Sequence, residues 1–215
     1  MSSEFIEAAR PSQFTEAKRR TRRNRLLVIG ACLFATIYTA AHAQTDAAWG
    51  PEQLMMQLGQ LRHGKARFVE RKYMKVLQSP LELTGTLTYE APGRLVKQTL
   101  QPRPETMTIE GDRLTIERRG RARTLRLQDY PALWAFVESV RSTLNGDLAG
   151  LQQFYALKLE GDQEHWTLAL TPKDAQMRGL IDSIRIGGHA GQVDTVEVRE
   201  AKGDRSVMTI VEDPP

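Results

Sequence analysis

The chain of 215 residues has one cysteine, Cys32, and four histidines. One cysteine cannot form a disulfide within the chain, so packing alone must hold the folded part together. An HExxH pattern would provide the histidine spacing that favours a metal site. His63, His165 and His189 stand far apart and form no such pattern. A G-x-S-x-G nucleophile motif and a Walker phosphate loop are also missing. The sequence therefore predicts no metal, no cofactor and no enzymatic activity.

A net basic charge is missing too, once the N-terminal region is set aside. The chain has 30 basic and 26 acidic side chains, but residues 1–43 hold 7 of the basic and 3 of the acidic ones. Residues 44–215 carry 23 of each sign and are formally neutral. Because nucleic-acid binding depends on a basic surface that displaces counterions, we expect no nucleic-acid partner.

The N-terminal region contains the three parts of a secretory signal. A dense basic run at residues 18–25 is followed by an uncharged, mostly apolar run at 26–41. Ala41-His42-Ala43 is a small-x-small cleavage pattern, and polar Gln44 follows it. The uncharged run has 16 residues, which is short for a helix that spans a membrane.

We therefore predict a signal peptide over residues 1–43, with an n-region at 1–25 and an h-region at 26–41. Cleavage is expected between Ala43 and Gln44, which leaves a mature domain at 44–215 in the periplasm. Because the n-region is long, an uncut inner-membrane anchor is the alternative interpretation.

Two short patterns concern the export route. Thr21-Arg22-Arg23-Asn24-Arg25-Leu26-Leu27 resembles a twin-arginine signal, but Arg25 stands where that pattern usually has an aromatic or apolar residue. Ile29-Gly30-Ala31-Cys32 resembles a lipobox, yet the residues after Cys32 stay uncharged and mostly apolar, which argues against lipidation. The choice between the general secretory route and the twin-arginine route stays open.

After residue 65 the hydrophobic pattern is mostly that of strands. Residues 81–89 alternate strictly, with Leu83, Gly85 and Leu87 on one face, which predicts a strand with one buried face. Gly85 on that face indicates a bend or a close backbone approach. The expected strands lie at 67–77, 81–89, 94–100, 106–109, 113–117, 124–127, 155–159, 166–170, 180–187, 192–200 and 205–211.

Two helices interrupt or precede these strands. The first opens at Gly50-Pro51, has leucines at helical spacing and ends near His63-Gly64. The second begins after Asp129, with Pro131 in its first turn, and stops at Asn145-Gly146.

This pattern predicts a mainly β (α+β) fold in one domain: a curled, unclosed antiparallel β-barrel of about eleven strands with helices as a lid or plug. A curled sheet under helices encloses either a packed core or an apolar cavity. Sequence does not separate the two, because both use the same residue types. The candidate cavity-lining residues are Leu83, Leu87, Met107, Ile109, Leu114, Ile116, Trp134, Phe136, Trp166 and Leu168.

A local basic patch has two interpretations. It could be a solvated edge that discourages strand pairing, or a docking surface for anionic lipid head groups or an acidic partner. The first is the more economical, because surface charge alone is weak support for a function. The patch consists of Arg118, Arg119, Arg121, Arg123 and Arg126.

Taken in order, several segments resemble the periplasmic outer-membrane lipoprotein carriers of the LolA family, of which the chain looks like a divergent member. The likeness runs over some 150 residues, and its strength lies in the order and spacing of the segments. The segments are Ala66-Arg67-Phe68-Val69-Glu70-Arg71, Leu83-Thr84-Gly85-Thr86-Leu87-Thr88-Tyr89, Ala91-Pro92-Gly93-Arg94-Leu95, Gln101-Pro102, Thr108-Ile109-Glu110-Gly111-Asp112-Arg113-Leu114, and His165-Trp166-Thr167-Leu168-Ala169-Leu170-Thr171-Pro172.

The resemblance implies a monomeric periplasmic carrier, without catalysis or cofactor, that shields the acyl chains of a lipidated cargo in an apolar cavity. The cargo would be a lipoprotein or another lipid conjugate, taken from an inner-membrane donor complex and passed to an outer-membrane acceptor. The alternative is a lipid-sensing regulatory module of the same fold, similar to the sigma-factor regulator RseB. One departure bears on the cargo: the family usually has an arginine before the proline where this chain has Ala91.

Overall fold

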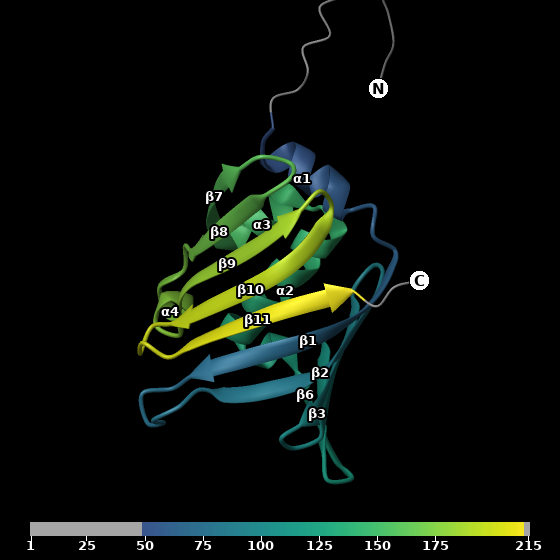
Figure 1. Cartoon of the computed structure of the whole chain (residues 1–215), viewed down its shortest axis with the longest axis vertical. Helices are drawn as coiled ribbons and strands as arrows, with labels where there is room; N and C mark the ends of the chain where they lie inside the picture. The colour runs from purple at the N-terminus through teal and green to yellow at the C-terminus, as the bar shows by residue number, and fades with distance from the viewer. Residues whose placement is uncertain (1–48, 213–215) are drawn as a thin grey trace, which may run out of the picture. The chain divides into compact units, whose positions relative to one another are not determined.

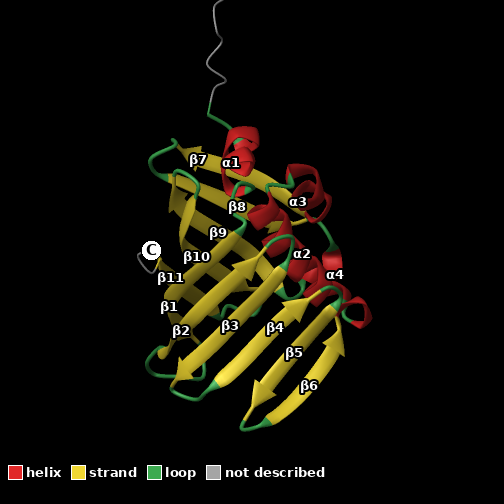
Figure 2. Cartoon of the chain, turned by 90° about the vertical axis from the view of Figure 1, so that its right-hand side faces the viewer, coloured by secondary structure: helices red, strands yellow, loops and turns green. Residues whose placement is uncertain are grey.

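A computed structural model describes residues 49–212 of the chain. Its strands form one antiparallel sheet in the order β6-β5-β4-β3-β2-β1-β11-β10-β9-β8-β7 (Figures 1 and 2). The outer strands β6 and β7 are not paired with each other, so the curled sheet is an unclosed barrel, as predicted. The eleven strands are β1 His63–Tyr73, β2 Leu81–Glu90, β3 Arg94–Gln101, β4 Glu105–Glu110, β5 Arg113–Arg118, β6 Arg121–Arg126, β7 Tyr155–Gly161, β8 Trp166–Pro172, β9 Ile181–His189, β10 Gln192–Glu200 and β11 Arg205–Glu212.

The alternation along β2 places its apolar side chains on the concave face of this sheet. Directly opposed residues of antiparallel strands share a face, and Leu87 lies opposite buried Ala66 of β1. Gly85 lies opposite buried Phe68, at a register shift between β2 and β3. A Cβ on Gly85 would overlap the Gln98 carbonyl group of β3 and lie 2.9 Å from Phe68 Cε1. The close backbone approach expected at Gly85 is therefore confirmed.

Four α-helices lie within the described residues: α1 Pro51–Leu58, α2 Pro131–Asn145, α3 Leu148–Phe154 and α4 Ala175–Arg178. Figure 2 shows them grouped on the concave side, between the wall of β7–β10 and the wall of β3–β6. Gly146 ends α2 in the left-handed conformation, at φ 69°, as its position after Asn145 predicts. The residue before α2 is Tyr130, because Asp129 lies instead in a 3-10 turn at Leu127–Asp129.

Helices α3 and α4 were not expected from periodicity, because seven and four residues are too few to show a helical repeat. Both begin at an aspartate whose side chain accepts hydrogen bonds from backbone N–H groups of the first turn. Asp147 accepts from Gly150 at 2.8 Å, and Asp174 accepts from Gln176 at 2.8 Å.

The core consists of two apolar clusters. The first cluster joins all four helices to the wall of β7–β10, and its buried members are Leu54, Met55, Leu58, Ala135, Leu151, Tyr155, Trp166, Leu168, Leu170, Met177, Ile184 and Ile186. The second cluster lies between α2 and β4–β5. Its buried members are Leu114, Leu127 and Val137, with half-buried Met107, Ile109, Ile116, Leu133, Trp134 and Phe136 packed against them. Phe136 packs against both clusters.

The signal peptide, its cleavage between Ala43 and Gln44, and the alternative membrane anchor all fall outside the described residues. Within residues 49–212, no helix has the length and apolar character needed to cross a membrane.

Candidate functional site

The ten residues proposed to line a cavity separate into three groups. Trp166 and Leu168 lie in the first cluster, with 2% and 0% of their surfaces exposed. The Trp166 indole Nε1 donates to the Ala190 carbonyl oxygen at 2.9 Å, across the turn between β9 and β10. The Gly187–Gly191 run spans the end of β9 and this turn, and the turn joins two paired strands. These two side chains are therefore packed among α1, α3 and the sheet.

Six of the ten belong to the second cluster. Leu114 is buried, and the other five are half-buried: Met107, Ile109, Ile116, Trp134 and Phe136. Cross-strand pairing puts Met107 opposite Ile116 and Ile109 opposite Leu114. Partly buried hydrophobic side chains also pack against the first cluster, but none of the ten candidates except Phe136 is among them. The structure thus brings together an apolar surface on β4–β5, covered in part by the first half of α2.

Leu83 and Leu87 lie on the concave face of β2, where the surface is part apolar and part charged. Leu83 is opposite Glu70 of β1, and Leu87 is opposite Lys97 of β3. Glu70 is 5% exposed and is bonded to the Lys97 ammonium group. Lys97 Nζ also lies 4.9 Å from the centre of the Phe68 ring. The concave face is therefore not uniformly apolar, because a buried carboxylate and a half-buried ammonium group form an ion pair on it.

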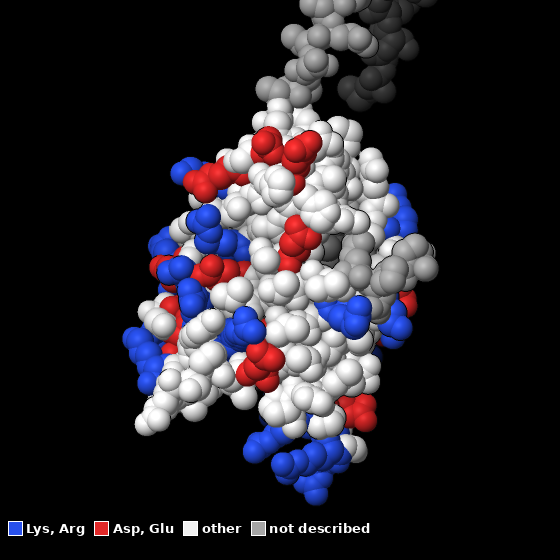
Figure 3. Space-filling model, in the orientation of Figure 1, with Lys and Arg blue, Asp and Glu red and all other residues white. Residues whose placement is uncertain are grey.

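Basic side chains gather where the β5–β6 hairpin turns. Figure 3 shows lysine and arginine grouped at the lower end of the molecule, and in Figure 2 the same ends of β5 and β6 extend away from the helices. Register places Arg118, Arg121 and Arg123 on the face of Ile116, and Arg126 on the opposite face. Because β6 is an edge strand, both interpretations of this basic patch remain compatible with the structure.

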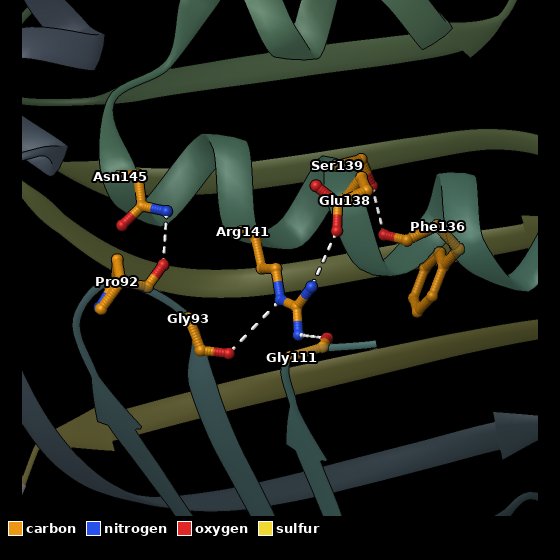
Figure 4. Close-up of polar contacts among 8 residues, drawn as sticks. All are labelled: Pro92, Gly93, Gly111, Phe136, Glu138, Ser139, Arg141 and Asn145. Atoms are coloured by element: carbon orange, nitrogen blue, oxygen red, sulfur yellow. Dashed lines mark hydrogen bonds and ion pairs between the residues drawn. The ribbon is translucent and has the colours of Figure 1, made fainter. Parts of the chain in front are cut away.

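Helix α2 is tied to two turns of the sheet by polar side chains near its C-terminal end (Figure 4). Arg141 is bonded to the carbonyl oxygens of Gly93 and Gly111 and pairs with Glu138 at 2.8 Å. Asn145 Nδ2 donates to the Pro92 carbonyl oxygen at 2.6 Å, and its Oδ1 accepts from the Tyr89 hydroxyl at 2.6 Å. Burial raises the pKa of that Tyr89 hydroxyl, and the positive charge of Arg62 lowers it by less.

These contacts bear on the missing arginine at position 91. Arg94 does not replace it, because it lies on the convex face, where it pairs with Glu90 at 3.0 Å and Glu110 at 3.9 Å. Instead, Arg141 of α2 reaches the turn at Ala91-Pro92-Gly93 and bonds to its Gly93 carbonyl oxygen. Sequence reasoning missed Arg141, since it is separated from this turn by 48 residues in the chain. The only sequence signal for this role is that Arg141 and Asn145, four residues apart, lie on the same face of the predicted helix.

Chemistry outside these surfaces is sparse in the described part of the chain. His189 Nδ1 lies 2.7 Å from Asp194 Oδ2 on the exposed side of a hairpin, and no group of three potential metal ligands occurs within residues 49–212. Burial raises the pKa of the Tyr155 hydroxyl, and the Ser139 hydroxyl lowers it by less. Within the described residues, no partner meets that buried hydroxyl with hydrogen-bond geometry.

Two pockets lie at the ends of the central strands β1, β9, β10 and β11. One, of about 440 Å³, is lined by Tyr73, Asp182 and residues between Arg199 and Arg205. The other, of about 250 Å³, lies beside it under the β1–β2 loop. Neither pocket is lined by any of the ten candidate residues.

Several solved structures are similar to this chain at low sequence identity. LolA superfamily protein NE2245 from Nitrosomonas europaea has a TM-score of 0.41 and 12% identity, over 78% of this chain and 96% of that one. The Pseudomonas aeruginosa MucA/MucB complex contains a chain with a TM-score of 0.43 and 14% identity, over 77% of this chain and 58% of that one. Mycobacterium tuberculosis lipoprotein LppX has a TM-score of 0.35 and 7% identity, over 75% of this chain and 96% of that one.

No curated protein is similar enough in sequence to match the chain. One protein family does match, over residues 40–211, which include β1 to β10 and all of β11 except its last residue. Its description is outer membrane lipoprotein carrier protein LolA-like. The chain therefore belongs to the LolA-like family of outer membrane lipoprotein carrier proteins.

Proposed function

We propose that this protein is a periplasmic carrier that shields the acyl chains of a lipidated cargo on its way to the outer membrane. The observation that carries the proposal is the second cluster, whose half-buried apolar side chains come from the concave wall of β4–β5 and from the α2 helix that covers it. Membership of the LolA-like family supports it. Each methylene group removed from water contributes about 0.8 kcal/mol, so a carrier needs a continuous apolar surface of this kind.

Within this proposal the acyl chains lie on Met107, Ile109, Ile116, Trp134 and Phe136, with Leu83 and Leu87 at the border of the site. Leu114 is buried within the second cluster, and Trp166 and Leu168 are buried in the first cluster, so these three side chains contribute packing and do not contact the acyl chains. The cargo is an acylated lipid or a lipoprotein, received from an inner-membrane donor complex and released to an outer-membrane acceptor. The carrier acts as a monomer with no cofactor.

The test begins with the full chain, expressed in a bacterial host and purified from the cell envelope. Mass spectrometry should detect copurifying acylated lipid, and the purified protein should bind a fluorescent fatty acyl probe. Ile116→Asn should weaken probe binding at least tenfold, because it puts an amide on the apolar surface. Thr115→Asn is the matched control, since Thr115 lies on the opposite face of the same strand. This variant should bind the probe as tightly as the wild-type protein does.

Protein that carries no lipid and takes up no probe would rule out the carrier function. Crosslinking in intact envelopes addresses the regulatory alternative. Transient contacts with membrane transport proteins support a carrier. A stable one-to-one protein partner, bound whether or not lipid is present, would indicate a sensor instead.

A further inference from the structure

The apolar surface of the second cluster borders directly on arginines. On the concave face, Ile116 of β5 lies opposite Arg123 of β6, and one step nearer the turn Arg118 lies opposite Arg121. Directly opposed side chains in an antiparallel pair have Cβ atoms about 5 Å apart. A ligand chain lying on Ile116 would therefore end within reach of guanidinium groups.

The charges of these arginines are not equally neutralised. Arg118 pairs with Glu105 of β4, which lies opposite it. No ion pair engages Arg121 or Arg123 within the part of the chain that the structure describes. Both side chains are exposed. Two guanidinium groups thus stand unneutralised on the concave face, at the outer end of the apolar surface.

We propose that Arg121 and Arg123 bind the anionic head group of an acyl lipid whose chain lies on the second cluster. This inference rests on the proposed carrier function and narrows its cargo to lipids with a phosphate or carboxylate near the acyl chain. Guanidinium groups bind such oxyanions through paired, charge-assisted hydrogen bonds. A zwitterionic or neutral head group would gain far less from two cations. The apolar surface then supplies affinity, and the arginines supply selectivity.

Two other roles for these arginines lead to different expectations. A charged edge that discourages pairing of β6 with another chain would not depend on which face the charges occupy. Attraction to an anionic membrane surface would act on the whole hairpin tip and would not require a bound acyl chain. The proposed head-group site depends on the concave face, and it operates on a single lipid molecule.

The experiment uses two lysolipids with the same acyl chain, kept below the concentration at which they form micelles. Lysophosphatidylglycerol carries a net negative charge and lysophosphatidylcholine is zwitterionic. Each displaces the fluorescent acyl probe from the purified protein. We expect lysophosphatidylglycerol to bind about tenfold more tightly at low salt, and the preference to shrink as salt is added. The double variant Arg121→Gln/Arg123→Gln should lose this preference while its affinity for lysophosphatidylcholine stays the same.

The matched control is Arg113→Gln/Arg126→Gln. Arg113 and Arg126 lie opposite each other on the same two strands but on the convex face, so this variant removes the same charge from the same hairpin. It should retain the tenfold preference. Circular dichroism and thermal unfolding confirm that both double variants are folded.

Equal affinity of the wild-type protein for both lysolipids would overturn the head-group site and leave the carrier function standing. An equal loss of preference in both double variants would also overturn it, because the effect would then belong to the general field of the hairpin. Selectivity that appears only on phosphatidylglycerol vesicles, and not with monomeric lysolipid, would assign the arginines to membrane attraction instead. Failure to bind either lysolipid or the acyl probe would overturn the carrier function itself.

Discussion

Arg141 Nε donates a hydrogen bond to the Gly93 carbonyl oxygen at 3.3 Å and so joins α2 to the turn between β2 and β3. The same guanidinium group bonds the Gly111 carbonyl oxygen in the turn between β4 and β5. The Arg141 side chain is 11% exposed. One side chain thus holds the helix over two turns of the concave wall, and α2 contributes Trp134 and Phe136 to the second cluster.

Arg141→Gln should loosen α2. We expect the free energy of unfolding to fall by about 2 kcal/mol, since hydrogen bonds to a charged group contribute roughly 1.5–3 kcal/mol. Amide hydrogens of α2 should exchange faster, and a bound acyl probe should dissociate faster. Urea unfolding, hydrogen exchange and probe kinetics measure the three effects. Arg126→Gln is the control, because its exposed pair with Asp129 at 3.5 Å should contribute under about 0.5 kcal/mol. Equal behaviour of the two variants would contradict this role for Arg141.

The Glu70–Lys97 ion pair should stabilise the sheet only while both partners are present. Lys97→Met leaves the carboxylate of Glu70 buried, with Lys72 Nζ 3.6 Å away as its other cation. We expect a loss of about 2–3 kcal/mol, because an uncompensated buried charge is costly. Glu70→Gln/Lys97→Met should recover most of that loss, because no buried charge then remains and the Lys72 ammonium group is exposed to solvent. Urea denaturation of the three proteins measures this, and a double variant less stable than Lys97→Met would refute the explanation.

Gly85→Ala should destabilise the protein by about 3 kcal/mol, because the new methyl group overlaps the backbone of β3 and overpacking of this kind forces backbone shifts. Gly64→Ala is the matched control in the neighbouring strand β1. A Cβ there would lie 3.5 Å from the Leu61 side chain, an ordinary contact. We expect its free energy of unfolding to change by under about 0.5 kcal/mol. Thermal unfolding of both variants is the measurement, and a Gly85→Ala protein as stable as the control would disprove the close approach.

Stability should fall at alkaline pH, and Tyr155→Phe should reduce the fall. Burial raises the pKa of Tyr155 in the folded protein. Above the unfolded-state value of about 10, only the unfolded chain releases this proton, so the free energy of unfolding decreases as pH rises towards the folded-state pKa. At neutral pH the variant should be as stable as the wild type or more stable, because the hydroxyl has no hydrogen-bond partner of ordinary geometry.

Tyr89→Phe separates this effect from the loss of a hydrogen bond. The pKa of Tyr89 is also raised by burial, but its hydroxyl donates to Asn145. This variant should therefore lose about 1 kcal/mol at neutral pH and also show a smaller alkaline fall. Urea unfolding at neutral and alkaline pH compares the three proteins. If Tyr155→Phe lost as much stability at neutral pH as Tyr89→Phe, the buried hydroxyl of Tyr155 would have a partner after all.

Much of the fold follows from local patterns. The alternation from Leu81 to Tyr89 predicts both a strand and its buried face, because successive side chains of a strand point in opposite directions. The short turns between strands predict antiparallel neighbours, and the stop at Asn145-Gly146 predicts the end of α2. Helices α3 and α4 escaped prediction because their lengths carry no periodic signal. The LolA-like segments, taken in order, pointed to the family that the match over residues 40–211 confirms.

The candidate site followed less completely from the sequence. Residue type could not separate Trp166, which is packed under α1 and α3, from Trp134, which is half-buried over β4–β5. Sequence does not distinguish Glu70 from the charged residues around it, and its pairing with Lys97 joins positions 27 residues apart in the chain. Arg141 reaches turns that are 48 and 30 residues away in the chain.

By itself, then, the sequence determined which residues alternate, where the chain turns and which family it belongs to. All three are read from patterns of residue types at short spacing along the chain. Cross-strand register places Arg121, Arg123 and Leu125 on one face of β6, a strand that the sequence predicts only over residues 124–127. Tertiary structure alone decided that this face is the concave one, since cross-strand register and the direction of curling depend on all eleven strands. It likewise decided which apolar side chains are sealed in a core and which remain half-exposed beneath α2, because burial depends on what packs against a residue from distant parts of the chain.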